Sequence, residues 1–181
     1  ARQWTGAKAS ATSASFIGVS GLTVVASDVS VAINRVASDN SVVDFGAQNL
    51  TVQTGTAGAP STMVLDMAGS LGALTQVSAA VEIDAFGLLM ARGTVTLQKS
   101  SGTVTVAGAS KAVDELLIGA NNLSAFVGVG GAWSAGTSAY TGTGLTLSGL
   151  KLGLAILKET GGSARQWTGA KASATSASFI G

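Results

Sequence analysis

Carboxylates are the main side chains in this sequence that could perform chemistry. The 181 residues contain no His and no Cys, so transition-metal sites and nucleophiles activated by an imidazole are not available. The only carboxylate clusters are Glu82 with Asp84 and Asp114 with Glu115. Two carboxylates can hydrolyse glycosidic bonds, but alternate residues of a strand share one face, so Glu82 and Asp84 are expected to face solvent. We therefore expect no enzyme, and keep a carbohydrate-active β-helix as an alternative.

Three further carboxylates, Asp28, Asp39 and Asp44, are the candidate ligands for calcium. A calcium site needs several oxygens that converge on one point. The glycine–aspartate nonapeptide of calcium-binding toxin repeats is absent from the sequence. We therefore expect no cofactor and no metal, and keep calcium at these three residues as the alternative.

The composition indicates a packed chain with an unusually uncharged surface. Hydrophobic residues make up 46% of the sequence and charged residues only 10%, whereas an ordinary globular domain is about a quarter charged. Disordered chains are poor in the aliphatic residues that abound here. No basic stripe could follow a phosphate backbone, so nucleic acid is not an expected partner. Gly, Ser and Thr interrupt the uncharged stretch 116–150, so no membrane span is expected.

An exact duplication sets the organisation of the chain. The segment ARQWTGAKASATSASFIG occupies residues 1–18 and again residues 164–181. Residues 1–163 are therefore one repeat unit, and residues 164–181 begin the next identical unit. Side chains near this boundary are the candidates for a contact between units, and they are Arg2, Trp4, Lys8, Glu159 and Trp167. We expect the tryptophans to pack and Glu159 to form ion pairs with the basic residues.

A weaker pattern recurs inside the unit and predicts β-strands. Residues 22–33 and 145–156 both alternate apolar and polar residues, pass through a small and a polar residue, and resume alternation in the opposite parity. Alternation predicts strands, and the change of parity is typical of a corner or a bulge. Residues 43–52, 81–90 and 116–127 fit the same template. We predict an all-β fold, a β-solenoid (β-helix) of about eight coils of roughly 20 residues that tandem repetition extends, with a length of about 40 Å per unit. The alternative is an antiparallel β-sandwich repeat.

One insertion is a candidate binding surface. Residues 132–143 separate two halves of the template and contain Trp133 and Tyr140, the only tyrosine. Insertions in repeat proteins emerge as loops on one face, which often binds a ligand. We expect a protruding loop in which Trp133 and Tyr140 contact a glycan or another surface ligand.

Three phrases carry a resemblance to a known class of proteins. FIGVSGLTVVASDVSVAINR, LSAFVGVGG and ARQWTGAKAS resemble the long degenerate repeats of giant secreted or cell-surface bacterial proteins, which are adhesin-like or structural. The resemblance implies an extended, mostly β architecture outside the cell and no catalytic residue. We expect a structural repeat of an extracellular fibre, stalk or filament whose partners are neighbouring copies of the same repeat. An adhesin-type binding module is the alternative.

Overall fold

Long β-strands dominate the computed structural model, which describes residues 1–16, 19–133, 139–161 and 165–181. The strands are β1 (Thr5–Phe16), β2 (Leu22–Arg35), β3 (Leu50–Gln53), β4 (Thr62–Leu65), β5 (Leu74–Ala85), β6 (Leu89–Val106), β7 (Ala109–Trp133), β8 (Tyr140–Glu159), β9 (Gln166–Ser173) and β10 (Ser176–Ile180). One 3-10 turn, η1, spans Gly69–Leu71. The described residues contain no α-helix, and the predicted all-β class is confirmed.

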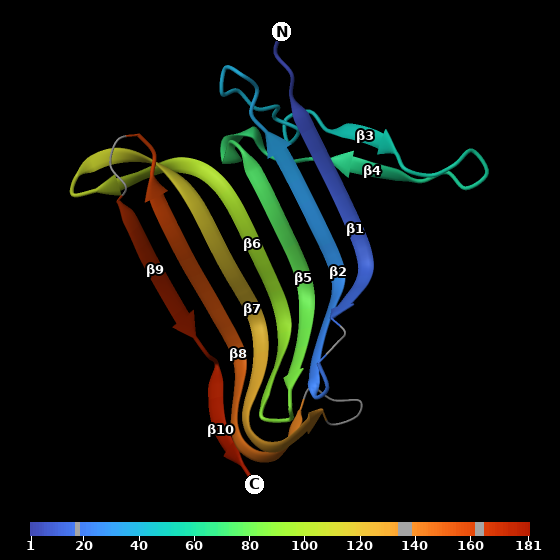
Figure 1. Cartoon of the computed structure of the whole chain (residues 1–181), viewed down its shortest axis with the longest axis vertical. Helices are drawn as coiled ribbons and strands as arrows, with labels where there is room; N and C mark the ends of the chain where they lie inside the picture. Colours follow the sequence, from blue (N-terminus) through green and yellow to red (C-terminus); the bar gives the residue numbers. More distant parts are fainter. Residues whose placement is uncertain (17–18, 134–138, 162–164) are drawn as a thin grey trace.

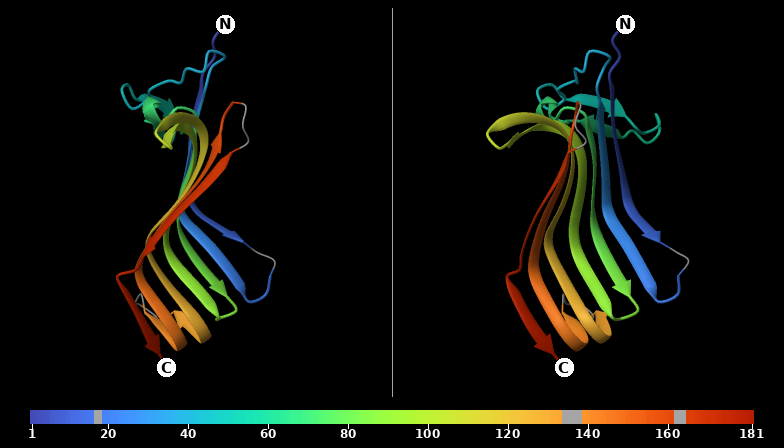
Figure 2. Two further views of the ribbon diagram at one scale, coloured as in Figure 1. Left: turned by 90° about the vertical axis from the view of Figure 1, so that its left-hand side faces the viewer. Right: turned by 60° about the vertical axis from the view of Figure 1, so that its left-hand side comes forward.

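A single antiparallel sheet contains all the strands except β3 and β4. Its order is β1-β2-β5-β6-β7-β8-β10, and β9 pairs with β8 ahead of β10 on the same edge. Successive strands in this sheet are neighbours, so the chain runs up and down as a meander (Figure 1). The sheet twists strongly along its strands (Figure 2). The described residues contain no helix long and apolar enough to cross a membrane.

The strand directions differ from the solenoid that the sequence predicts. A solenoid pairs residues one coil apart in parallel, whereas every strand pairing described here is antiparallel. The antiparallel pairing agrees with the alternative prediction, but this sheet has no second sheet of similar size packed on it among the described residues. Periodicity fixes the side-chain faces and not the strand directions, so it is equally compatible with coils and with a meander.

Bulges explain the parity changes in the sequence. The register shifts between Ser27 and Ser30 in β2 and between Ala120 and Leu123 in β7. Asp28 and Asn122 at these shifts have φ of 51° and 52°, a left-handed conformation that Asn and Asp tolerate better than most residues. A further shift between Leu150 and Leu147 in β8 includes Gly149, which has a φ of 58°. Three of the five template segments therefore lie in long strands with a bulge, in β2, β7 and β8. The segment 81–90 contains the turn between β5 and β6, and the segment 43–52 is mostly loop.

A small core forms where residues 36–73, here called the covering segment, fold over one face of the sheet. Phe45, Leu65 and Met67 of this segment pack on Ala32 and Leu74 of the sheet. The buried Asn34 donates a hydrogen bond from Nδ2 to the carbonyl oxygen of Val43 at 2.8 Å. We call this side of the sheet the core face. The covering segment includes the hairpin of β3 and β4, which extends past the β1 edge of the sheet (Figure 1).

Candidate functional site

The two copies of the duplicated segment lie on opposite edges of the sheet. The first copy forms β1 and pairs with β2, with Thr5 opposite Arg35 and Ser15 opposite Val25. The second copy forms β9 and β10 and pairs with β8, with Trp167 opposite Leu157 and Phe179 opposite Leu145. Figure 1 shows β1 at one edge and β9 with β10 at the other. One sequence is therefore seen beside each of the two strands that it would have to join in a tandem array.

Following directly opposed residues across the sheet, from the first copy of the duplicated segment to the second, shifts the position in the segment by an even number of residues. Starting at Lys8, the directly opposed residues are Ala32, Gln76, Gln98, Leu117, Ala155 and Gly169. Gly169 is the duplicate of Gly6 and not of Lys8, so one unit displaces the register by two residues. Side chains alternate between faces with a period of two. The even displacement therefore leaves the second copy with the same residues on the core face as the first copy.

In the first copy, the boundary residues contact the loop that follows β2. Arg2 Nη1 lies 3.1 Å from Asp39 Oδ2, and both side chains are largely exposed. Trp4 Nε1 donates a hydrogen bond to Ser41 Oγ at 3.0 Å. The Arg2 guanidinium lies 5.6 Å from the centre of the Trp4 ring, within the range of a cation–π contact. These contacts tie the start of the unit to its own residues 39–41.

In the second copy, the equivalent arginine binds the end of β8 instead. Arg165 Nε and Nη2 donate to the two carboxylate oxygens of Glu159 at 2.7 and 2.9 Å. The Arg165 guanidinium again lies 5.6 Å from the ring of Trp167. Glu159 is only 7% exposed and also lies 3.6 Å from Lys111 Nζ. Its hydrogen bonds hold the pKa of Arg165 above the ordinary value. The boundary arginine thus has an acidic partner on each side of the duplicated segment.

Lys8, the second basic boundary candidate, pairs with a residue of the covering segment. Lys8 Nζ lies 2.9 Å from Asp66 Oδ1. Beside it, Gly6 lies under the Phe45 ring, and a Cβ added to Gly6 would approach a ring carbon to 2.6 Å. Nothing lies within 4 Å of the equivalent position on Gly169. The two copies therefore differ in cover: the first lies under the covering segment and the second is open.

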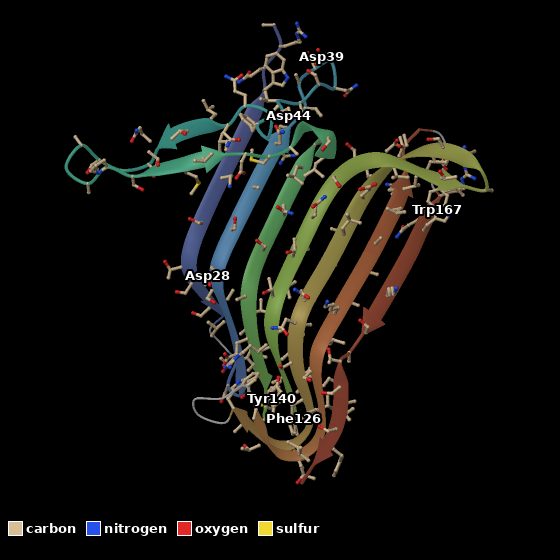
Figure 3. All side chains as sticks on the ribbon, turned by 180° about the vertical axis from the view of Figure 1, so that it is seen from behind. Asp28, Asp39, Asp44, Phe126, Tyr140 and Trp167 are labelled. Atoms are coloured by element: carbon tan, nitrogen blue, oxygen red, sulfur yellow. The ribbon has the colours of Figure 1, made fainter. Side chains whose placement is uncertain are left out.

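The three calcium candidates do not converge. Asp28 lies at the bulge in the middle of β2, while Asp39 and Asp44 lie at one end of the sheet (Figure 3). The Asp39 carboxylate accepts hydrogen bonds from Ser41, which lower its pKa, with a smaller effect of Arg2. Asp44 Oδ1 accepts the backbone N–H groups of Gly69, Ala47 and Gly46 at 2.9 to 3.1 Å. These hydrogen bonds lower the pKa of Asp44. Among the described residues, no group of three acidic side chains could hold a metal ion.

Trp133 and Tyr140 lie opposite each other where β7 meets β8, and both side chains are half-buried. Their ring centres are 4.5 Å apart, and the Tyr140 ring stacks on the fully buried Phe126 at 5.7 Å. The Arg92 guanidinium lies 3.9 Å from the Trp133 ring centre. Burial raises the pKa of Tyr140 to about 12. Trp133 and Tyr140 thus belong to an aromatic cluster against the sheet, and residues 134–138 of the predicted protruding loop lie outside the described residues.

The members of the two carboxylate pairs, Glu82 with Asp84 and Asp114 with Glu115, have different partners and do not act together. Glu82 Oε2 accepts hydrogen bonds from Arg92 Nε and Nη2 at 2.9 and 2.6 Å, and Asp84 accepts the N–H of Gly87 in the turn after β5. Glu115 accepts a hydrogen bond from the buried Ser100 at 3.1 Å, whereas Asp114 lies opposite Lys158. The sequence analysis missed Arg92, although residues 82 and 92 are equidistant from Gly87 and so oppose each other across a hairpin.

Comparison with protein-family models, curated proteins and solved structures finds no match for this chain.

Proposed function

We propose that this chain is a structural repeat of an extracellular fibre or stalk, in which successive units join into one continuous antiparallel sheet. The observation that carries the proposal is the position of the duplicated segment. Its first copy pairs with β2 and its second copy pairs with β8. In a tandem array the second copy is the first strand of the next unit, so a single strand would join β8 of one unit to β2 of the next.

The side-chain contacts support such a joint. The even register displacement keeps the core face on one side of the sheet from unit to unit. The boundary arginine has Glu159 of the preceding unit on one side and Asp39 of its own unit on the other. A charged joint of this kind would orient successive units. The array also removes unpaired strand edges, which are hazardous in an isolated sheet.

The dimensions of the array follow from the sheet order. One unit contributes β1, β2, β5, β6, β7 and β8 to the sheet. At about 4.8 Å between strands, these six strands advance the array by about 29 Å per unit. This value replaces the 40 Å expected for eight solenoid coils, because the array grows across its strands and not along a coil axis.

The neighbouring copy is therefore the principal partner in this proposal. The low charge and the abundance of Gly, Ser and Thr suit a sheet that packs against copies of itself. The resemblance to repeats of giant surface proteins of bacteria supports a location outside the cell. The proposal needs no catalytic residue and no cofactor.

Small-angle X-ray scattering of chains with one, two and four units tests the proposal. A continuous sheet predicts that, once the array is wider than its strands are long, the maximum dimension grows linearly by about 29 Å per unit. For units joined as independent flexible beads, the maximum dimension would instead grow roughly with the square root of their number, and that result would overturn the proposal.

Antibody labelling of intact cells that express the parent protein tests the location, and labelling only after the cells are broken would contradict it.

A further inference from the structure

The core face of β7, β8 and β9 carries an open apolar groove. We infer that the covering segment of the following unit, residues 36–73 of that unit, packs into this groove and locks the joint. The inference rests on the proposed tandem array and names the second contact that holds two units together. Its partner is a second copy of this chain.

The groove has a volume of about 490 Å³ and a floor of small residues. Gly119, Gly153 and Gly169 belong to three neighbouring strands, and an added Cβ on any of them would meet nothing within 4 Å. Leu117 and Ala155 lie beside them on the same face, because they oppose each other and Gly169 in the register. A floor of glycines lowers the surface of the sheet and leaves room for another layer of chain.

The duplicated segment shows what belongs in this space. Gly6 and Gly169 are the same residue of the repeat, with the same neighbours in sequence. Gly6 is covered by Phe45 and Leu65, whereas Gly169 is open. In an array Gly169 becomes the Gly6 of the following unit, so the Phe45 of that unit would cover it. Lys171, the duplicate of Lys8, would likewise pair with the following unit's Asp66, as Lys8 pairs with Asp66 here.

The covering segment also reaches beyond its own sheet. The β3–β4 hairpin extends past the outer edge of β1, away from β2 (Figures 1 and 3). In an array this edge is occupied by β8 of the preceding unit, and β7 lies one strand further on. Val52, Met63 and Leu65 of the hairpin line one pocket together with Gly6, Ala7 and Lys8 of β1, and Val52 remains 41% exposed. The tip of the hairpin, residues 54–61, would then lie over the Gly153 and Gly119 floor.

Directed disulfide formation in a two-unit chain tests this packing. The native sequence has no Cys, so a disulfide within one chain can form only between the two introduced thiols. Gly153→Cys in the first unit and Val52→Cys in the second unit place one thiol on the groove floor and one on the hairpin above it. The matched control exchanges the units, with Val52→Cys in the first and Gly153→Cys in the second. We expect oxidation to close the first pair at least about tenfold faster than the exchanged pair, since only the first is held at a high effective concentration.

Equal rates in the two arrangements, or no closure in the first, would overturn the inference.

A second pair of variants gives an independent result without new thiols. Gly119→Gln with Gly153→Gln fills the groove, and we expect it to increase proteolysis of the joint when placed in the first unit but not when placed in the second. Resistance in both would again count against the packing. Scattering separates the two proposals, because a chain that still grows linearly retains the continuous sheet even if its groove is empty.

Discussion

Single residues of the duplicated segment show that contacts, and not sequence alone, decide their roles. Arg2 and Arg165 have the same neighbours in the chain, yet one binds Asp39 and the other binds Glu159. Gly6 lies beneath Phe45, while Gly169 is open. The same substitution at the two copies is therefore an internal control for the effect of the covering segment.

Gly6→Ala and Gly169→Ala are expected to have different effects on stability. The added methyl group at position 6 would collide with the Phe45 ring, and such overpacking costs about 1–3 kcal/mol. The same group at position 169 meets open space and should be neutral or slightly stabilising, because Ala loses less backbone entropy than Gly. Urea unfolding of the two 181-residue variants measures the difference. Equal destabilisation would show that Phe45 does not pack on Gly6.

Asp44 is expected to stabilise the loops of the covering segment in a pH-dependent way. Its lowered folded-state pKa means that the contribution is fully present above the ordinary value of 3.8 and is lost as the pH falls through the folded pKa. The difference in unfolding free energy between the native chain and Asp44→Ala should therefore shrink below pH 3.8. Asp44→Asn is the matched control, since it keeps an oxygen acceptor without titrating. A difference for Asp44→Ala that persists undiminished in acid would contradict the hydrogen bonds to its carboxylate.

Tyr140 provides a second titration that is simple to observe, because it is the only tyrosine. Burial raises its pKa to about 12, so the folded state holds the phenolic proton more tightly than the unfolded chain does. Stability is expected to fall as the pH rises from the ordinary value of 10 toward about 12. Tyrosinate absorbance in the native and the urea-unfolded chain measures both midpoints. A native midpoint at the ordinary value would mean that Tyr140 is solvated and outside the aromatic cluster.

At the scale of elements, the strands depend on bulges that keep apolar residues on their faces. The bulge at Asn122 of β7 faces an irregularity in the adjoining strand β6, since the register shifts at Gly93 and a Cβ added to Gly93 would collide with Leu123. Each bulge resets the alternation in its own strand. The bulges therefore allow strands of up to 25 residues to bend without exchanging their two faces.

Asn122→Val tests the conformation of the β7 bulge. Asn122 is exposed and has a φ of 52°, so its replacement removes little packing. A β-branched residue in this left-handed conformation should cost at least about 1–2 kcal/mol, whereas Asn122→Gly should be neutral. Thermal unfolding of both variants measures the effect. Val and Gly variants of equal stability would argue that position 122 is regular strand.

At the scale of the whole molecule, the 181-residue chain has two strands, β9 and β10, in addition to the strands of one unit. Its β8 edge is covered by the duplicated segment. A chain of residues 1–163 would lack that cover and would present an open β8 edge together with the open outer edge of β1. These edges are complementary but different, so their pairing between molecules is heterologous and does not close.

The 1–163 chain is therefore expected to form open-ended assemblies as its concentration rises, while the 1–181 chain is not. A single unit should not pair its own two edges, because a two-residue displacement over six strands gives a tilt of only about 13°, against 35–45° in closed sheets. Sedimentation velocity over a range of concentrations measures the difference. The idea fails if the 1–163 chain sediments as a monomer throughout while the 1–181 chain assembles.

The sequence by itself determined the all-β class, the exact duplication and the places where alternation breaks. These features depend on local patterns of side chains, which a linear sequence records directly. It also named the boundary residues as candidates for a contact between units. It could not assign Arg2 to Asp39 or Lys8 to Asp66, because the folding of the covering segment brings these pairs together.

Only the tertiary structure decided that the strands form a meander and not coils, because a period of two is the same in parallel and antiparallel sheets. The structure also separated the three calcium candidates and placed Trp133 and Tyr140 against Phe126, as these distances depend on how distant strands bend and pair. Likewise, the sequence shows that residues 1–18 and 164–181 are identical, whereas only the structure shows that they lie on opposite edges of the sheet. The two copies differ in position because one pairs with β2 and the other with β8, and strand pairing between distant segments cannot be read from the duplicated segment itself.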